Sequence, residues 1–235
     1  MYVRSPDAMT AVEDTSAPDA SFVRRALVVE DDSFTRTLIG HLLEGEGFEV
    51  RLCTSSAEAI DAFGVFDPDV LVVDVQLGAA PNGAQLAEAL RQRAPYLGVV
   101  VVSNFPVASS AGLGNPLPPG AAFLHKAQIR EPRLLIEAID SALVDSLPRM
   151  VRQSSLEESP LARLTPAQLA ILHQVALGLS NAEIARQRGT TLRNAEKLIS
   201  RTFSALGLTD DATHNPRVTA TRIYIEAMGV PRDDR

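Results

Sequence analysis

The sequence contains very little cysteine, lysine and tryptophan, and these shortages exclude several classes of protein. Its 235 residues include one cysteine, Cys53, and no tryptophan. A single cysteine can form neither an internal disulfide nor a thiolate metal site, so we expect a protein of the reducing cytoplasm. No apolar run approaches the roughly 18 residues that cross a bilayer, so we expect no membrane partner.

Charge is unevenly distributed along the chain. Residues 1–160 contain 12 Lys and Arg against 22 Asp and Glu, whereas residues 161–235 contain 10 against 7. This asymmetry indicates a basic surface joined to an acidic part, but a balance of +3 also fits an ordinary solvated face. Only two lysines occur, Lys126 and Lys197.

Short β-branched apolar runs alternate with helical patterns between residues 23 and 147. This alternation predicts an α/β, doubly wound, flavodoxin-like sheet of five parallel strands. Residues 104–120 contain four prolines and three glycines, so we expect no regular helix between the last two strands. The expected strands are Ala26–Val29, Val50–Cys53, Val70–Val73, Val99–Val102 and Ala121–Leu124.

Composition divides the chain into four segments. Residues 1–22 are polar, acidic and without an apolar core, so we interpret them as a disordered leader rather than a secretory signal. Residues 23–147 form the α/β domain, and the polar segment 148–160 is a linker. Residues 161–235 form a small all-α domain, with helices expected to begin after Thr165, Ser180 and Asn215 and at about Leu192.

Acidic, hydroxyl and cationic side chains follow the ends of the predicted strands. Carboxyl ends of parallel strands share one edge of a sheet, so these residues should converge. Clustered carboxylates favour a bound cation, and oxygen ligands suit Mg²⁺. Alternatively, the acidic run at 30–32 only caps the helix that begins near Ser33. The residues are Glu30, Asp31 and Asp32, then Asp74, Ser103 and Lys126.

Four motifs in residues 24–147 resemble the receiver domain of two-component response regulators: Leu27–Asp32, Leu71–Asp74, Val102-Ser103 and Phe123–Lys126. The resemblance implies that Asp74 accepts a phosphoryl group from the phosphohistidine of a sensor histidine kinase. It also implies that Mg²⁺ is held by Glu30, Asp31, Asp74 and the backbone carbonyl of Gln76. Lys126 would pair with the phosphoryl oxygens, Ser103 would move to them, and Phe123 would turn inward or, alternatively, remain a packed strand residue.

Two departures from the family pattern keep a rival function open. Ala127 stands where the family has proline, and residues 104–120 replace a regular fourth helix. The rival is a phosphorylation-independent transcription factor whose receiver serves as a dimerisation or ligand-sensing module. An aspartyl-phosphate phosphatase is disfavoured because Gln76, two residues after Asp74, cannot act as a general acid. We therefore expect a phosphoacceptor and not an enzyme.

The C-terminal helices form a helix-turn-helix candidate. In the second helix, Leu192–Leu206, a buried stripe is expected at Ala195, Leu198, Ile199, Thr202 and Leu206. The opposite, polar face could enter a DNA major groove, although polar outer faces are also common on ordinary helical hairpins.

Four motifs resemble the LuxR/NarL-type DNA-binding domain: Leu164–Pro166, Gly178–Ala185, Ser200-Arg201 and Leu206–Leu208. The resemblance implies a homodimer on double-stranded promoter DNA. Glu196 matches the lysine with which the family reads DNA, so the contact residues cannot be transferred directly. We predict them from the polar face as Asn194, Lys197, Ser200 and Arg201.

Overall fold

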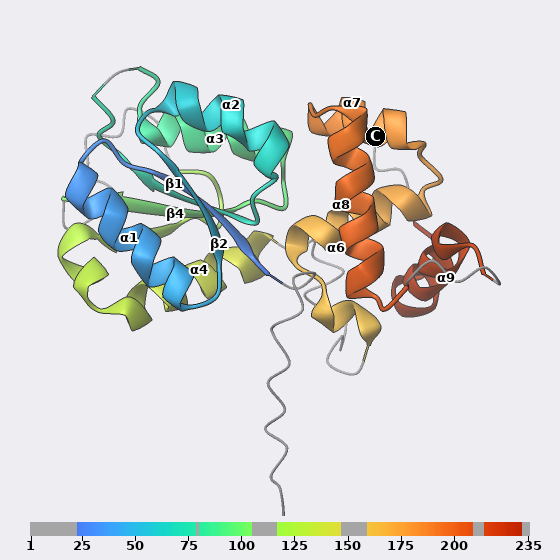
Figure 1. The fold of residues 1–235 in the computed structure, drawn as a ribbon. Helices are drawn as coiled ribbons and strands as arrows, with labels where there is room; N and C mark the ends of the chain where they lie inside the picture. The colour runs from blue at the N-terminus through green and yellow to red at the C-terminus, as the bar shows by residue number, and fades with distance from the viewer. Residues whose placement is uncertain (1–22, 79, 105–116, 147–158, 209–213, 232–235) are drawn as a thin grey trace, which may run out of the picture.

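The computed structural model describes residues 23–78, 80–104, 117–146, 159–208 and 214–231 (Figure 1). The predicted leader, most of the glycine- and proline-rich segment and most of the linker lie outside these ranges. Within them, an α/β domain lies beside a domain made only of helices.

Five parallel strands form one sheet in the order β2-β1-β3-β4-β5. The strands are β1 (Arg25–Val29), β2 (Glu49–Cys53), β3 (Val70–Asp74), β4 (Gly98–Ser103) and β5 (Ala122–His125). Every residue of β3 and β4 is buried, as expected for central strands that are covered on both faces. The predicted five-stranded parallel sheet is confirmed.

Alternate side chains of each strand enter two separate cores. Leu27, Leu71 and Val99 pack on one face under α2 (Ser56–Phe66) and α3 (Gly83–Arg93). Val28, Val72 and Val100 pack on the other face, under α1 (Ser33–Gly45) and α4 (Pro132–Ser146). Figure 1 shows these two helix pairs on opposite sides of the sheet. Each fully buried Val or Leu contributes about 1.5–3 kcal/mol, so the sheet is a rigid support for the residues at its edges.

The helical domain contains α6 (Pro166–Ala176), α7 (Asn181–Arg188), α8 (Leu192–Ala205) and α9 (Pro216–Met228). The 3₁₀ helix η2 (Lys126–Arg130) follows β5, and a second 3₁₀ helix, η4 (Pro160–Arg163), precedes α6. Thr165, Ser180 and Asn215 cap α6, α7 and α9 as predicted, each accepting a backbone N–H.

Two details of the helical domain differ from expectation. Glu183 does not complete a capping box with Ser180, because its carboxylate binds Arg186 at 2.6 Å on the same helix. The buried stripe of α8 includes Ala205, whereas Leu206 caps the helix and is only partly buried. The other four predicted positions, Ala195, Leu198, Ile199 and Thr202, are buried.

None of the helices in the described ranges is both long enough and apolar enough to cross a membrane.

Candidate functional site

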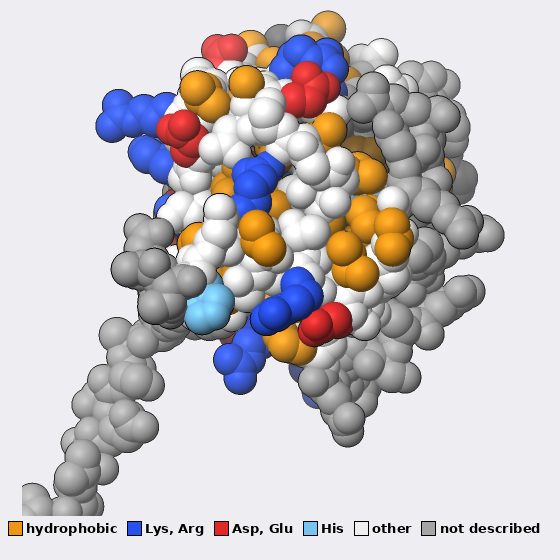
Figure 2. All heavy atoms as spheres, turned by 90° about the vertical axis from the view of Figure 1, so that its right-hand side faces the viewer, with side chains coloured by type: hydrophobic (Ala, Val, Ile, Leu, Met, Phe, Trp, Pro, Cys, Tyr) orange, Lys and Arg blue, Asp and Glu red, His pale blue; other side chains and the backbone are white. Residues whose placement is uncertain are grey.

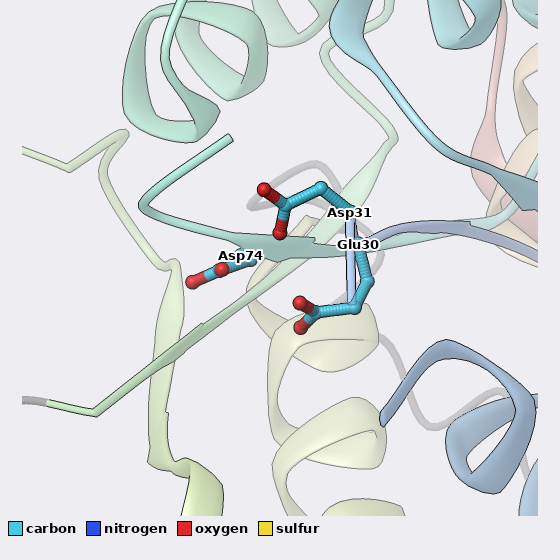
Figure 3. Close-up of side chains that lie close together, drawn as sticks. All are labelled: Glu30, Asp31 and Asp74. Carbon is cyan, nitrogen blue, oxygen red and sulfur yellow. The ribbon is translucent and has the colours of Figure 1, made fainter. Parts of the chain in front are cut away.

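Three carboxylates meet at the carboxyl edge of the sheet. Glu30 and Asp31 directly follow β1, and Asp74 is the last residue of β3. One ligand oxygen from each lies within 4.8 Å of the others, and Figure 3 shows the three side chains around a shared space. Glu30 and Asp74 are 1% and 5% exposed, whereas Asp31 is exposed. Among the described residues of the cluster, Asp31 is therefore the one that meets solvent.

Lys126 contacts both buried carboxylates and offsets part of their negative charge. Its Nζ lies 2.8 Å from Glu30 Oε2 and 2.9 Å from Asp74 Oδ2. Burial raises the pKa of Glu30, and the charge of Asp74 adds to this, while the Lys126 hydrogen bond opposes both. Burial disfavours the charge on Lys126, but the hydrogen bonds to Glu30 and Asp74 outweigh it and raise its pKa. The lysine thus stays cationic beside Asp74.

The donor set of this cluster fits Mg²⁺. All three side chains offer carboxylate oxygens, and one of them is exposed, which suits an ion that keeps several of its waters. The loop after β3 also approaches the cluster, since Gly78 N–H lies 3.4 Å from Asp31 Oδ2. Gln76 lies in this loop, and its carbonyl as a further ligand stays a prediction.

The third acid of the run has a structural role. Asp32 is exposed and caps α1 by accepting the Thr35 N–H at 2.8 Å. This hydrogen bond lowers the pKa of Asp32. The capping alternative is therefore correct for Asp32, whereas Glu30 and Asp31 lie in the cluster.

Ser103 and Phe123 lie on the strands next to the cluster. Ser103 ends β4 and is buried, and it pairs in register with His125, the residue before Lys126. Phe123 is partly buried and packs against the core beneath α2 and α3. The structure thus places both residues where the sequence predicts them, and their switch roles stay predictions.

Gly83 positions Asp74 in a way that the sequence analysis missed. A Cβ at Gly83 would lie 1.8 Å from the Asp74 carbonyl oxygen and 2.9 Å from Val73 Cγ2. No other residue type fits so close to a backbone, so the first turn of α3 packs directly on the end of β3. The only sequence signal was a glycine at the start of a helix.

The polar face of α8 lies against the α/β domain. Asn194, Lys197 and Arg201 line a cleft of about 460 Å³ between the two domains. The opposite wall carries both acids and arginines, among them Arg25 and Arg51. Arg201 Nη1 lies 3.9 Å from Glu49 Oε2 on this wall. Ser200 is exposed. The acids of that wall are Glu49, Glu58 and Asp61.

A buried ion pair joins the two domains beside this cleft. Arg188, the last residue of α7, donates to Asp67 Oδ1 at 2.5 Å, and its side chain is 5% exposed. Its guanidinium stacks 4.5 Å from the Tyr96 ring centre, and the Tyr96 hydroxyl donates to the same Asp67 oxygen at 2.8 Å. The Thr190 hydroxyl donates to the Gly64 carbonyl. These contacts fix the orientation of α8 toward the α/β domain.

The outer side of the helical domain has mixed character. Figure 2 shows basic side chains scattered among hydrophobic ones and a few acids, not gathered into one stripe. Val218, in α9, and Val230, which follows this helix, are 66% and 74% exposed. A continuous basic DNA-binding surface is therefore not evident on this side.

Comparison with known families identifies the first domain. Residues 26–112 match the response regulator receiver domain. The matched residues include Glu30, Asp31 and Asp74, so the acidic cluster lies in the part of the chain that is similar to a receiver domain, and the bounds 23–147 stay a prediction.

Several relatives that match most of the chain are named as transcriptional regulators or response regulators. The transcriptional regulatory protein TdiR of Thauera aromatica is 27% identical over 207 residues, covering 86% of this chain and 88% of that protein. The nitrate/nitrite response regulator NarP of Escherichia coli is 25% identical over 216 residues, covering 87% and 96%. Full-length FixJ from B. japonicum, a solved structure, has 21% identity and a TM-score of 0.45, covering 87% and 97%. The LuxR/NarL-type assignment of residues 161–235 stays a prediction.

Proposed function

We propose that this protein is a two-component response regulator that accepts a phosphoryl group on Asp74 and regulates transcription by binding DNA. The observation that carries the proposal is the buried contact of Lys126 with both Glu30 and Asp74, at 2.8 and 2.9 Å. Its input would be a sensor histidine kinase and its setting the cytoplasm. Its parts would be the leader 1–22, the receiver 23–147, the linker 148–160 and the DNA-binding domain 161–235.

The transfer chemistry follows from the roles of three side chains. An Asp74 carboxylate oxygen attacks the phosphorus of the phosphohistidine, the P–N bond breaks, and the imidazole leaves with the bonding electrons. Lys126, held cationic by its two carboxylate partners, stays beside the new phosphoryl oxygens and stabilises their charge. Ser103, at the end of the neighbouring strand, would supply a hydroxyl to another of these oxygens.

A divalent cation completes this site in the proposal. Glu30, Asp31 and Asp74 would hold Mg²⁺, with the Gln76 carbonyl, and the bound ion would supply positive charge against the phosphoryl oxygens. Without it, the negative charge of the arriving phosphoryl group would repel the carboxylates.

The protein acts here as a phosphoacceptor and not as an enzyme. A phosphatase of this type needs a general acid beside the nucleophile, and the side chain two residues after Asp74 is the amide of Gln76. The phosphoryl group would therefore persist on Asp74 long enough to act as a signal.

The output would be DNA binding through α8. Asn194, Lys197, Ser200 and Arg201 would form its contact surface, with two copies of the chain on one promoter. Because three of these four residues line the interdomain cleft, the domains must separate before α8 can enter a major groove. The relatives, which are transcriptional regulators, support this output.

One experiment tests the input. The full chain and its Asp74→Asn variant are incubated with acetyl phosphate and Mg²⁺, and intact masses are recorded. We expect one phosphoryl group on the wild type, one on the Asp61→Asn control, whose exposed carboxylate lies on α2, and none on Asp74→Asn. Uptake by Asp74→Asn would mean that the site is elsewhere. No uptake by the wild type would favour the phosphorylation-independent transcription factor instead.

A further inference from the structure

The imidazole of His125 joins two backbone segments at the edge of the phosphoacceptor site. Its Nε2 lies 2.9 Å from the carbonyl oxygen of Asn104, the residue directly after β4. Its Nδ1 accepts the backbone N–H of Ala127 at 3.2 Å, in the first turn of η2. One ring therefore contacts the residue after Ser103 and the residue after Lys126.

The two contacts require a single arrangement of the ring hydrogen. Nδ1 carries a lone pair, because it accepts the Ala127 N–H, and the hydrogen of the neutral ring is then on Nε2. That hydrogen points to the Asn104 carbonyl, so the 2.9 Å contact is a donated hydrogen bond. The backbone pairing of Ser103 with His125 in the sheet holds the ring at this point.

We propose that His125 is a positioning residue that holds the end of β4, and with it Ser103, in the arrangement that precedes phosphorylation. This inference rests on the proposed function. Asn104 follows Ser103 directly, so a shift of the end of β4 that brings the Ser103 hydroxyl toward a phosphoryl group on Asp74 would also displace the Asn104 carbonyl from its contact with the ring. The hydrogen bond from Nε2 opposes that movement.

The contact of His125 Nδ1 with Ala127 has a different role. It caps the 3₁₀ turn that begins with Lys126, and Gln128 completes the cap by accepting the His125 N–H at 3.0 Å. Losing this cap would loosen the lysine rather than free the serine. The two halves of the ring thus have opposite expected effects on phosphoryl binding.

Three variants separate the two halves. In His125→Asn, the amide oxygen stands at the bond distance of Nδ1 and keeps the cap, but the side chain is too short to reach Asn104. In His125→Gln, the amide nitrogen stands at the bond distance of Nε2 and keeps the contact to Asn104, but the cap is lost. His125→Ala loses both.

The measurement is the affinity of each full-length variant for beryllofluoride, a phosphoryl analogue, at fixed Mg²⁺, followed by ¹⁹F NMR of the bound fluoride. We expect His125→Asn to bind about threefold to tenfold more tightly than the wild type, the range expected for one hydrogen bond lost from the unliganded state. His125→Gln should bind no more tightly than the wild type, and His125→Ala should fall between the two. Melting temperatures show whether any variant has changed in overall stability.

Equal or weaker binding by His125→Asn would overturn the proposal, and so would equal tightening by His125→Asn and His125→Gln. Asp74→Asn distinguishes this failure from that of the proposed function. If the wild type binds beryllofluoride no better than Asp74→Asn, both proposals fail; if it binds well and the histidine variants match it, only the role of His125 fails.

Discussion

The two ends of strand β3 each carry a buried aspartate, and the two are used differently. Asp74 ends the strand and shares Lys126 with Glu30 in a cluster that opens to solvent at Asp31. Asp69 directly precedes the strand and is fully enclosed between the domains, where its Oδ2 accepts the Arg25 N–H at 2.9 Å. The Asp74 end, which we call the open end, is accessible to ligands from solvent. The Asp69 end, which we call the closed end, contacts only protein groups.

A buried charge without a full counter-charge has different consequences at the Asp74 and Asp69 ends of β3. At the Asp74 end, excess negative charge attracts a cation, because a cation can enter from solvent. At the Asp69 end, burial raises the pKa of the carboxyl to about 6, and the Thr165 hydroxyl and Arg25 N–H only partly oppose this. Nearby, Arg188 balances Asp67 instead. Charge at the closed end therefore governs how the domains are held.

We expect the largest effect from a variant that disrupts the buried Asp67–Arg188 ion pair between the domains. Arg188→Met leaves Asp67 buried without its cation, a change that costs about 3–5 kcal/mol in a closed site. The domains should relieve this cost by separating, which small-angle X-ray scattering would detect as a larger radius of gyration. Arg186→Met, on the exposed side of the same helix, is the matched control and should leave the scattering unchanged. A compact Arg188→Met chain would show that the pair does not hold the domains.

The second effect concerns pH at the same end. A carboxyl whose pKa is about 6 in the folded chain and 3.8 ordinarily binds more proton when folded. Its contribution to stability is therefore complete below pH 3.8 and is lost as the pH rises through 6. The loss is about 3 kcal/mol by neutral pH, since one pKa unit corresponds to about 1.36 kcal/mol.

Asp69→Asn removes this titration and keeps an acceptor for the Arg25 N–H. Denaturant unfolding of the variant and the wild type between pH 4 and 7 should give a stability difference that shifts in favour of the variant as pH rises. The charged neighbours Asp67, Arg188, Arg25 and Arg201 are the same in both chains, so their contributions largely cancel. A pH-independent difference would mean that Asp69 does not titrate in this range.

The third effect tests the open end. Asp31→Asn should weaken Mg²⁺ binding at least about 10–100-fold, the loss that even outer-shell changes cause. Thermal stability should hardly change, since Asp31 is exposed and its charge repels Glu30 and Asp74. Asp32→Asn is the control, because asparagine caps a helix as well as aspartate does. Equal Mg²⁺ affinity in Asp31→Asn and the wild type would exclude Asp31 as a ligand.

The smallest expected effect concerns DNA binding by a chain whose domains have been separated. In an Arg188→Met background, Lys197→Ala should lose about 1–3 kcal/mol of binding confined to one base position if Lys197 reads a base. A phosphate contact would instead weaken all sequences alike and lower the salt slope by about 1. Glu196 beside it repels phosphate, so we expect base reading. Salt titrations on selected and random duplexes decide this, and no DNA binding by the Arg188→Met chain would contradict the output.

Much of the fold could be predicted from local patterns. Val70–Val73 was predicted as a strand because a continuous β-branched run fits a strand covered on both faces, and β3 extends it only to Asp74. The acids and Lys126 were placed together because strand ends share an edge. Thr165-Pro166 and Asn215-Pro216 gave the starts of α6 and α9 within one residue.

The remaining features depend on residues that are distant in sequence. Arg188 and Asp67 are 121 residues apart, and Arg188 by itself resembles any basic residue in the last turn of a helix. Gly83 and His125 each contact a backbone atom of another segment, which no periodicity encodes. Glu183 had the spacing of a capping box, but a competing arginine one turn on decided its partner.

The cleft between α8 and the wall formed by β2 and α2 also determines how the closed arrangement depends on protein concentration. Both walls belong to one polypeptide, so each meets the other at an effective concentration of about millimolar, whatever the protein concentration. For a chain that binds DNA through α8, a promoter competes with the α/β domain for this helix, and dilution of the protein does not weaken that intramolecular contact. Without DNA and at a given pH, the fraction of closed molecules is then independent of protein concentration, so synthesis of more protein raises open and closed copies in the same ratio.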